Sequence, residues 1–343
     1  MQKFIKILLI LSLFLIVGYF SLEKISSTKI NKNNKLQNIT IAQWGQEKYL
    51  IYLPFYIAQE RGFFKDEKLQ VNIKYSGNDD QVFATVLNGE AKFGIGDPIF
   101  TAIAREKGAK GKVIASIVNG VALWGISKKE NNISQVLNVE DLSNLRIGTF
   151  PKPSTTYTLI KNTIAENKNI LKNTTIVEAS FGTQIALLES NNSDIAMELE
   201  PGASIAESQG YEIVYSLPEF YGDFSFTGLT TLEDTIKNET LLVQKVVNAI
   251  EKSCVFAHSN HEETIKIAQK LFPKQDANII KKAVLRMINA NTLPPHAFTS
   301  IKGWEKAIDI RVQVGDLKSS KNSTLSLDNS FALKAKEEIW KID

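Results

Sequence analysis

The sequence holds two short stretches in which small or hydroxyl-bearing residues separate an apolar run from a helical pattern. In the first, "FGIGDP", these residues are Gly94, Gly96, Asp97 and Pro98. Glycine lets a ligand or a neighbouring backbone approach closely, and the free N–H groups of the helix that follows can bind a polar atom. We predict that Gly96 and Asp97 contact a ligand. The alternative is a plain turn in which Asp97 caps the helix and Pro98 fills its first turn.

The second stretch, "PKPSTTY", offers three consecutive hydroxyls on Ser154, Thr155 and Thr156. One of them suffices as the N-cap of the following helix, because a cap needs a single side-chain oxygen. The excess of hydroxyls predicts that all three residues lie at a ligand-binding site. The alternative is an ordinary N-cap.

Aromatic and acidic residues follow two other expected strands. Trp44, Gln46 and Tyr49 come after "NITIAQ", where an aromatic ring can stack on a flat ligand; core packing is the alternative for Trp44. Glu198 and Glu200 end "DIAMELE" and share one face of that strand. A carboxylate there accepts hydrogen bonds from an amine or an aminopyrimidine. We predict Glu200 as a ligand contact, with a solvated charge as the alternative.

Arginine is scarce, and none of the five arginines falls in these turns. A strongly anionic ligand is often held by the two-pronged fork of a guanidinium group. We therefore expect no such fork here. The five arginines are Arg61, Arg105, Arg146, Arg286 and Arg311.

Histidine and cysteine give no sign of metal or nucleophilic chemistry. His258 and His261 have a spacing that could suit a metal, but no third ligand of suitable type and spacing stands nearby. His258 lies near a helix end, and Asn260 with Glu263 resembles the capping pair of the next helix. Cys254 shares a helical face with apolar residues. We predict no metal site and a buried structural thiol.

From residue 38 onward, short β-rich runs alternate with helical runs. This order predicts α/β lobes with mostly parallel sheets covered by helices. We expect the chain to leave the first lobe near 120–128 and to return near 222–230. These crossings assign 38–123 and 226–343 to lobe 1 and 124–225 to lobe 2. Such lobes close like a hinge on a ligand at the carboxyl ends of their strands.

Residues 1–20 have the pattern of a targeting segment, with Lys3 and Lys6 before an apolar run that ends at Phe20. The length of this run suits a signal peptide better than a membrane span. No clear cleavage site follows, so an uncleaved anchor is the alternative. Residues 21–37 are polar and predict a linker. The first thirty residues carry the whole net charge of +3, and the neutral remainder lacks the basic surface expected of a nucleic-acid-binding domain.

The chain resembles the solute-binding proteins of ABC importers in the nitrate, sulfonate, taurine and thiamine-pyrimidine-precursor (NMT1/THI5-like) family. The resemblance covers roughly residues 38–320 and rests on an ordered set of segments. Leu199 stands where the family usually has Trp before an acidic-Pro element, and the Cys-rich run of related pyrimidine synthases is absent. The matching segments are "FYIAQERGFFKDEKLQVNI", "VLNGEAKFGIGDPIFTAIAREKG", "LRIGTFPKPSTTYTLIK", "MELEPGASIAESQGYEIV" and "LTTLEDTIKNETLLVQKVVNAIEKSCVFAHSNHEETIKIA".

The resemblance implies a two-lobe, type II periplasmic-binding-protein fold and a non-enzymatic function without a cofactor. The protein would capture a sulfonate, taurine, nitrate or a pyrimidine thiamine precursor and deliver it to an ABC permease. The acidic strand end and the missing arginines favour a nitrogen-bearing organic solute. A periplasmic location is implied, with membrane contact only through the N-terminal segment. The alternatives are a pyrimidine-related enzyme, which needs a reactive Cys or His in the cleft, and a membrane-tethered sensor, which needs a signalling domain.

Overall fold

The computed structural model describes residues 35–321 and 324–340. Contacts divide the chain into Met1–Gln37 and a compact unit, Asn38–Asp343, and the description below concerns the second. The predicted export segment, 1–20, and nearly all of the predicted linker, 21–37, lie outside the described residues. Within the described ranges, no helix has both the length and the apolar character needed to cross a bilayer.

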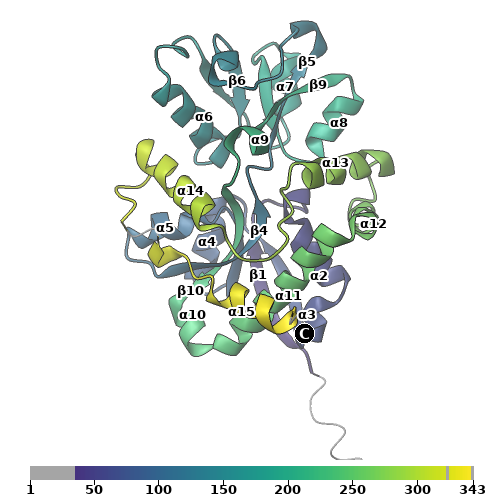
Figure 1. Cartoon of the computed structure of the whole chain (residues 1–343), viewed down its shortest axis with the longest axis vertical. Coiled ribbons are helices and arrows are strands. Elements are labelled where there is room, and N and C mark those ends of the chain that lie inside the picture. Colours follow the sequence, from purple (N-terminus) through teal and green to yellow (C-terminus); the bar gives the residue numbers. More distant parts are fainter. Residues whose placement is uncertain (1–34, 322–323, 341–343) are drawn as a thin grey trace, which may run out of the picture. The chain divides into compact units, whose positions relative to one another are not determined.

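Two five-stranded sheets form the framework of this unit (Figure 1). In the first sheet the strands follow the spatial order β2 (Leu69–Tyr75), β1 (Gln37–Gln43), β3 (Phe93–Gly96), β10 (Ser225–Leu232) and β4 (Gly111–Asn119). In the second the order is β7 (Thr175–Glu178), β6 (Arg146–Thr149), β8 (Ile195–Glu198), β5 (Trp124–Lys128) and β9 (Tyr211–Ser216). The chain passes to the second sheet between β4 and β5 and returns between β9 and β10.

The sheets are mixed, because β10 in the first and β5 in the second run against both of their neighbours, so the prediction of mostly parallel sheets is confirmed in part. Strand β1 pairs with β3, and β6 with β7 and β8, in parallel. Strand β10 is antiparallel to β3 and β4, and β5 is antiparallel to β8 and β9. Both antiparallel strands are the first after a passage between sheets. A strand that enters from the other sheet arrives at the edge where the parallel strands end, so it runs against them.

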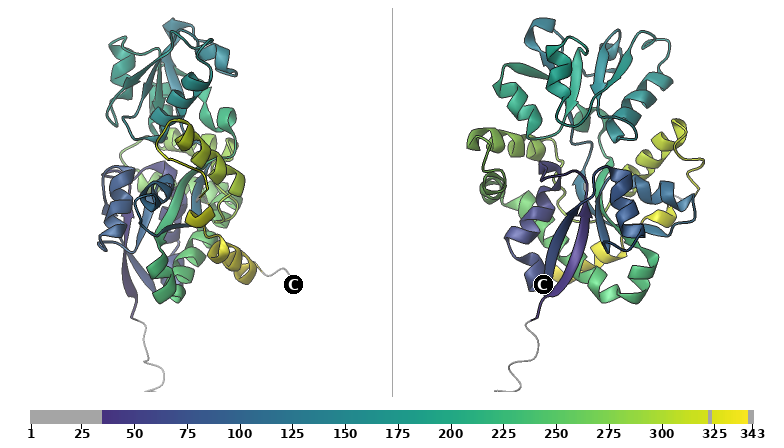
Figure 2. Two further views of the ribbon diagram at one scale, coloured as in Figure 1. Left: turned by 90° about the vertical axis from the view of Figure 1, so that its left-hand side faces the viewer. Right: turned by 180° about the vertical axis from the view of Figure 1, so that it is seen from behind.

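Helices cover the sheets, as the alternating pattern predicts (Figures 1 and 2). The helices that contact the first sheet are α2 (Leu53–Glu60), α3 (Phe63–Asp66), α4 (Asp79–Leu87), α5 (Ile99–Arg105), α10 (Glu233–Asn238), α11 (Thr240–Ser259) and α15 (Ser330–Ile339). Those that contact the second sheet are α6 (Thr155–Glu166), α7 (Gln184–Glu189) and α8 (Gly202–Ser208). Helix α14 (Ile301–Gln313) also contacts the first sheet. The remaining helices are α9 (Leu217–Tyr221), α12 (His261–Leu271) and α13 (Ala277–Asn289), with 3-10 turns η1 (Leu50–Tyr52), η2 (Lys129–Asn131), η3 (Val139–Leu142) and η4 (Thr324–Ser326).

Two C-terminal helices contact helices that cover the second sheet. Helix α14 packs against α6 beside the second sheet, and against β10 and α5 of the first. Helix α13 packs against α8 and against α12. The region after residue 226 therefore touches the helices that cover the second sheet, and the lobe boundaries at 123/124 and 225/226 stay a prediction.

Helix ends follow the local sequence, with one difference that matters for the site. Pro54 lies in the first turn of α2, and Gly62 has a φ of 77°, a conformation that glycine adopts without strain and that ends the helix. Helix α4 has Asn78 as its N-cap in a capping box with Gln81. The sequence "DDQVFATVLNGE" predicts Asp79 or Asp80 as this cap, but both are instead the first two residues of the helix, so their carboxylates are free for other contacts.

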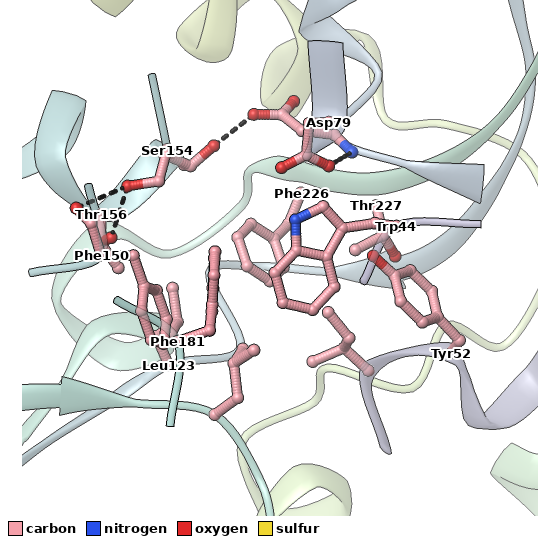
Figure 3. A pocket seen from close by; sticks show the side chains of 14 residues that line it. Trp44, Tyr52, Asp79, Leu123, Phe150, Ser154, Thr156, Phe181, Phe226 and Thr227 are labelled. Atoms are coloured by element: carbon pink, nitrogen blue, oxygen red, sulfur yellow. Dashed lines mark hydrogen bonds between the residues drawn. The ribbon is translucent and has the colours of Figure 1, made fainter. Parts of the chain in front are cut away.

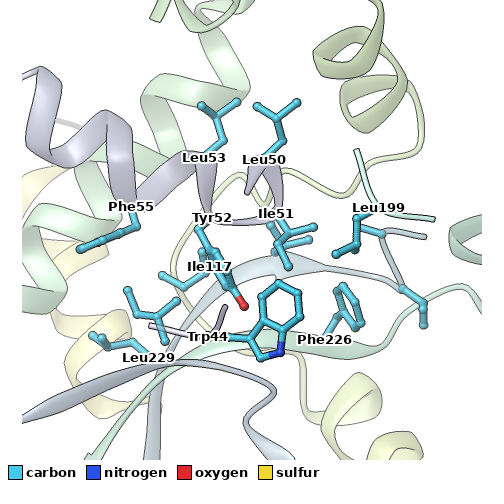
Figure 4. Packing of buried hydrophobic residues seen from close by; sticks show 14 of the residues in the cluster. Trp44, Leu50, Ile51, Tyr52, Leu53, Phe55, Ile117, Leu199, Phe226 and Leu229 are labelled. Carbon is cyan, nitrogen blue, oxygen red and sulfur yellow. The ribbon is translucent and has the colours of Figure 1, made fainter. Parts of the chain in front are cut away.

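The apolar core continues to the ends of the strands (Figure 4). Tyr52, Leu53 and Phe55 are buried in the same core as Trp44, so α2 and the turn before it pack their apolar side chains inward. Cys254 is fully buried on α11, and burial raises the pKa of its thiol. It is the buried structural residue that the helical pattern predicts.

Candidate ligand-binding site

A small cavity, here called the inner cavity, lies between elements of the two sheets (Figure 3). Its free space is about 40 Å³, room for a few water molecules. Its lining combines aromatic and apolar side chains with two carboxylates and five hydroxyls, one of them the phenol of Tyr52. The residues are Trp44, Ile51, Tyr52, Asp79, Asp97, Leu123, Phe150, Ser154, Thr155, Thr156, Phe181, Leu199, Phe226 and Thr227.

Aromatic rings from both sheets meet at this cavity. Trp44, just after β1, lies edge-on to Phe181, just after β7, with ring centroids 4.4 Å apart. Phe181 stacks on Phe150, which follows β6, at 4.2 Å. Trp44 also contacts Tyr49 at 4.6 Å. Trp44 is 4 % exposed, so it packs in the core, and it also forms a wall of the cavity. Its stacking on a ligand stays a prediction.

Two aspartates face each other at the start of helices α4 and α5. The Asp97 N–H donates to Asp79 Oδ1 (2.7 Å), and Asp97 Oδ1 accepts from the Ile99 N–H (3.0 Å), which is the expected helix-capping contact. A Cβ on Gly96 would lie 2.8 Å from Asp79 Oδ1. Gly96 therefore serves to admit the Asp79 carboxylate against β3, an explanation for this glycine that the sequence did not suggest.

Asp97 also connects the two sheets. The Thr155 hydroxyl, at the start of α6, donates to Asp97 Oδ2. Arg311 of α14 donates from Nη2 to the same oxygen at 3.3 Å. The guanidinium also binds Thr158 Oγ1 (2.7 Å) and Asp316 Oδ2 (2.8 Å). The two predicted helix starts, at Asp97 and Thr155, thus meet directly.

The two carboxylates resist ionisation. Burial, and then the negative charge of Asp97, raises the pKa of Asp79 to about 7. Burial also raises the pKa of Asp97, against the opposing effect of Arg311. Asp97 is 7 % and Arg311 3 % exposed at the side chain, so little solvent screens either charge. The pair forms a local concentration of negative charge with one cation behind it.

The Ser154 and Thr156 hydroxyls stabilise the turn that precedes α6. Ser154 Oγ accepts from the Tyr157 N–H (3.4 Å), which makes it the N-cap of α6. The same hydroxyl donates to the Phe150 carbonyl (3.0 Å) and contacts Thr156 Oγ1 (3.0 Å). One residue caps the helix, as the sequence predicts, and all three line the inner cavity.

A wider outer cavity shares Trp44, Phe181 and Leu199 with the inner one. Gln46, Tyr49, Glu198 and Glu200 line it. Burial raises the pKa of Glu198 to about 7, and Glu198 Oε1 accepts from the Leu199 N–H (2.8 Å). Both the inner and the outer cavity lie where strands β1, β6 and β8 end, as the sequence predicts for the ligand.

Glu200 is engaged by protein groups. Its Oε1 accepts from Arg286 Nε (2.7 Å) and from the Ser204 hydroxyl (2.9 Å), and its Oε2 accepts from the Ser204 N–H (3.0 Å). The side chain is fully buried. These contacts hold α8 to α13, and a ligand role for Glu200 stays a prediction.

No arginine falls within the predicted binding turns along the sequence, but two arginines reach them in the folded chain. Arg311 contacts Asp97, and Arg286 contacts Glu200, because α13 and α14 fold back onto the site from the C-terminal part of the chain. No local signal marks such a contact, since Arg311 and Asp97 are 214 positions apart. Both guanidinium groups are bound to carboxylates.

Several other lining residues carry no clear signal in the sequence. Asp79 stands where a helix cap is expected, and the aromatic pair Phe150 and Phe181 follows strands that show no special pattern. Thr227 lies inside the returning strand β10. The signal that could have identified Asp79 is the glycine opposite it, Gly96, because a missing Cβ on a buried strand leaves room for a neighbouring side chain.

The histidines lie at helix ends, as expected. His258 is in the last turn of α11, and His261 begins α12. The predicted capping pair is wrong: Asn260 donates to the Phe256 carbonyl, and Glu263 pairs with Lys266. Among the described residues, no group of three His, Cys, Asp or Glu side chains is arranged to hold a metal ion.

The family model described as "NMT1/THI5 like" matches residues 51–264. The chain belongs to this family. A curated relative, "Putative binding protein YtlA" of Bacillus subtilis, is 24 % identical over 274 residues, which cover 78 % of this chain and 81 % of the relative. The periplasmic aliphatic sulphonate-binding protein SsuA of Escherichia coli has a similar structure, with a TM-score of 0.67, 12 % identity and coverage of 85 % of this chain and 92 % of SsuA.

The type II periplasmic-binding-protein fold predicted from the sequence is confirmed by this structural likeness. The same fold also occurs in an enzyme. The desulfurization enzyme DSZB matches with a TM-score of 0.65 and 12 % identity, over 88 % of this chain and 99 % of the enzyme. The fold alone therefore does not separate binding proteins from enzymes, and the residues of the site must do so.

Proposed function

We propose that this family member is the extracytoplasmic solute-binding component of an ABC importer, which captures a small solute between its lobes and delivers it to a permease. The observation that carries this proposal is the inner cavity. Its lining comes from the ends of β1, β3 and β10 in one sheet and of β6, β7 and β8 in the other. A solute held there contacts both sheets at once, so binding favours the closed form.

The contacts across the cavity support hinge closure. Trp44 meets Phe181, and Thr155 donates to Asp97. Each contact joins a residue of the first sheet's lobe to one of the second. Because the chain connects β4 to β5 and β9 to β10 by only two passages, rotation about these passages separates the contacts without disturbing either sheet.

Export supports the same role. Lys3 and Lys6 with the apolar run to Phe20 have the pattern of a signal peptide or an uncleaved anchor. We propose that the binding unit reaches the periplasmic side of the membrane by this segment. Cell fractionation tests the location, and recovery of the protein in the cytosolic fraction would contradict it.

Binding is favoured over the enzymatic alternative by the cavity's side chains. Covalent catalysis on a pyrimidine needs a reactive Cys or His, and neither type is present among the described residues that line the inner or the outer cavity. The decisive experiment is native mass spectrometry of freshly purified protein, followed by titration calorimetry with the compound found. We expect a bound small molecule that is released unchanged. A chemically altered product after incubation would favour the enzyme.

A further inference from the structure

The walls of the inner cavity have an uneven charge. Among the described residues that line it, Asp79 and Asp97 are the charged ones. Arg311 lies behind Asp97, and its N–H groups already bind Asp97, Asp316 and Thr158. With both carboxylates ionised, two negative charges face the cavity and one positive charge lies outside its lining. An anion brought here would be repelled, and it would find no unoccupied guanidinium.

Lys152 does not offset the negative charge of the inner cavity. Lys152 lines a small neighbouring cavity that shares Asp79 and Trp44. Its Nζ lies 3.4 Å from Glu178 Oε1 and 4.7 Å from the centre of the Tyr157 ring. Its side chain is 60 % exposed, so water screens its charge.

A second observation points to a missing ligand. The Thr227 hydroxyl, which lines the inner cavity (Figure 3), has no hydrogen-bond partner among the described residues. Thr227 is 3 % exposed. A buried hydroxyl without a partner costs free energy, and a polar group of a bound solute would relieve that cost.

The aromatic walls complete the chemistry. Trp44, Phe150, Phe181 and Phe226 surround the space that the carboxylates face. Aromatic faces attract cations and pack against flat bodies. An environment of carboxylates and aromatic faces suits a positive charge that is spread over a planar N–H-bearing group. The free space of about 40 Å³ requires that this group be small or that the lobes part slightly to admit it.

We propose that the inner cavity selects a small, flat organic cation, such as an amidinium or guanidinium group, bound by Asp79 and Asp97 between the aromatic walls. The cation donates N–H hydrogen bonds to the carboxylates and offers a polar atom to Thr227. This inference rests on the proposed function, because it names the class of solute that the same site captures.

Titration calorimetry at pH 8 and fixed ionic strength tests the charge preference with two sets of matched planar probes. One set is guanidinium, urea and nitrate; the other is benzamidinium, benzamide and benzoate. Within each set, shape is nearly constant and charge changes. We expect at least one cation to bind at least tenfold more tightly than its neutral counterpart, with no measurable binding of the anions. If an anion binds as tightly as its cation, or if neither cation binds, the inference is overturned.

The variant Asp79→Asn assigns the preference to this carboxylate. It keeps an oxygen for the Asp97 N–H and removes the charge. We expect cation affinity to fall at least tenfold and benzamide affinity to stay within twofold. Asp80→Asn, on the exposed neighbour in the same helix turn, is the matched control and should change neither affinity. Equal cation affinity in the folded Asp79→Asn variant and the wild type would contradict the assignment. The wild-type titrations stand even if a variant fails to fold.

Native mass spectrometry of the protein from its own cells separates this inference from the proposed function. A co-purified cation would support both. A co-purified anion or neutral solute would overturn the cation preference and leave the binding-protein function in place. Failure to bind solutes of any charge would contradict both.

Discussion

At the scale of single residues, the site depends on carboxylates held where ionisation is costly. Asp79 and Asp97 lie close together, and Arg311 balances only the second directly. Such an arrangement lowers the stability of the empty protein. It also makes the free energy of binding a cation more favourable. Sites of this kind trade stability for function.

The stability cost of Asp79 depends on pH. Its pKa rises from 3.8 to about 7 on folding, so the native state retains the proton that the unfolded chain has lost. The contribution of Asp79 to the free energy of unfolding is most favourable at low pH, and it is lost as the pH rises from about 4 to about 7. The ionisable groups that Asp79 faces are Asp97, Arg311, Asp80 and Tyr52, and burial raises the pKa of Tyr52 well above its usual range.

We therefore expect Asp79→Asn to stabilise the empty protein above pH 7, by on the order of 1 kcal/mol. The difference from the wild type should shrink as the pH falls toward 4. Urea unfolding at pH 5 and pH 8 measures both values. Asp80→Asn serves as the control and should show no such trend. A gain that is equal at both pH values would show that Asp79 does not carry the raised pKa.

Glu200 illustrates a different use of a buried carboxylate. Arg286 and Ser204 occupy both of its oxygens, and burial raises its pKa against the effect of Arg286. The group fixes α8 against α13. Glu200 lies at the end of a strand, which predicts ligand binding. The same position lies just before α8, where a side chain is also needed to hold the start of that helix.

We expect Glu200→Gln to lower the free energy of unfolding by about 2 kcal/mol, because one partner of a charged hydrogen bond is lost. Solute affinity at the inner cavity should stay within twofold of the wild type. Chemical denaturation and calorimetry provide the two readings. Glu189→Gln, on the exposed end of α7, is the control. A large loss of affinity without a loss of stability would restore Glu200 as a direct ligand contact.

At the scale of elements, the sequence predicts what local patterns determine. The strands, the helices between them, the Ser154 cap and the end of α2 at Gly62 all follow from residues within one or two turns. The direction of β5 and β10 and the position of α14 do not, because long-range pairing sets them. The site divides in the same way: Asp97 and Thr155 could be predicted, and Arg311 could not.

Helix α14 is held in place by the long-range contacts of one residue, Arg311. Arg311 joins α14 to Thr158 of α6, to the Pro153 carbonyl before it, and to Asp97. The planar fork of arginine can bind several acceptors at once, which a lysine ammonium cannot do in the same geometry.

We expect Arg311→Lys to lower the free energy of unfolding by about 2 kcal/mol, since buried hydrogen bonds to a charged group are lost. Urea unfolding measures the change. Arg61→Lys, at an exposed position, should stay within about 0.5 kcal/mol of the wild type. Equal effects of the two substitutions would show that Arg311 does not tie α14 to the site.

At the scale of the whole binding unit, few direct contacts close the inner cavity between the lobes. Thr155 donates to Asp97, and Trp44 meets Phe181. The Thr155 hydroxyl is not needed to cap α6, because Ser154 does so. Its hydrogen bond therefore affects the position of one lobe relative to the other and is not needed for the fold of either lobe.

We expect Thr155→Val to shift the empty protein toward an open form. A hydrogen bond to a charged acceptor contributes about 1.5–3 kcal/mol, so its loss should change the closed-to-open ratio by at least about tenfold. Small-angle X-ray scattering should report a larger radius of gyration for the variant without solute and equal radii once solute saturates both proteins. The melting temperature should change little, since each lobe keeps its own core. The matched control is Thr175→Val, which makes the same substitution on the exposed edge strand β7, away from the cavity. This variant should scatter like the wild type. If Thr155→Val scatters like the wild type as well, the bond between Thr155 and Asp97 does not hold the lobes together, and closure depends on other contacts, such as those of Trp44 with Phe181 and of Arg311 with Thr158.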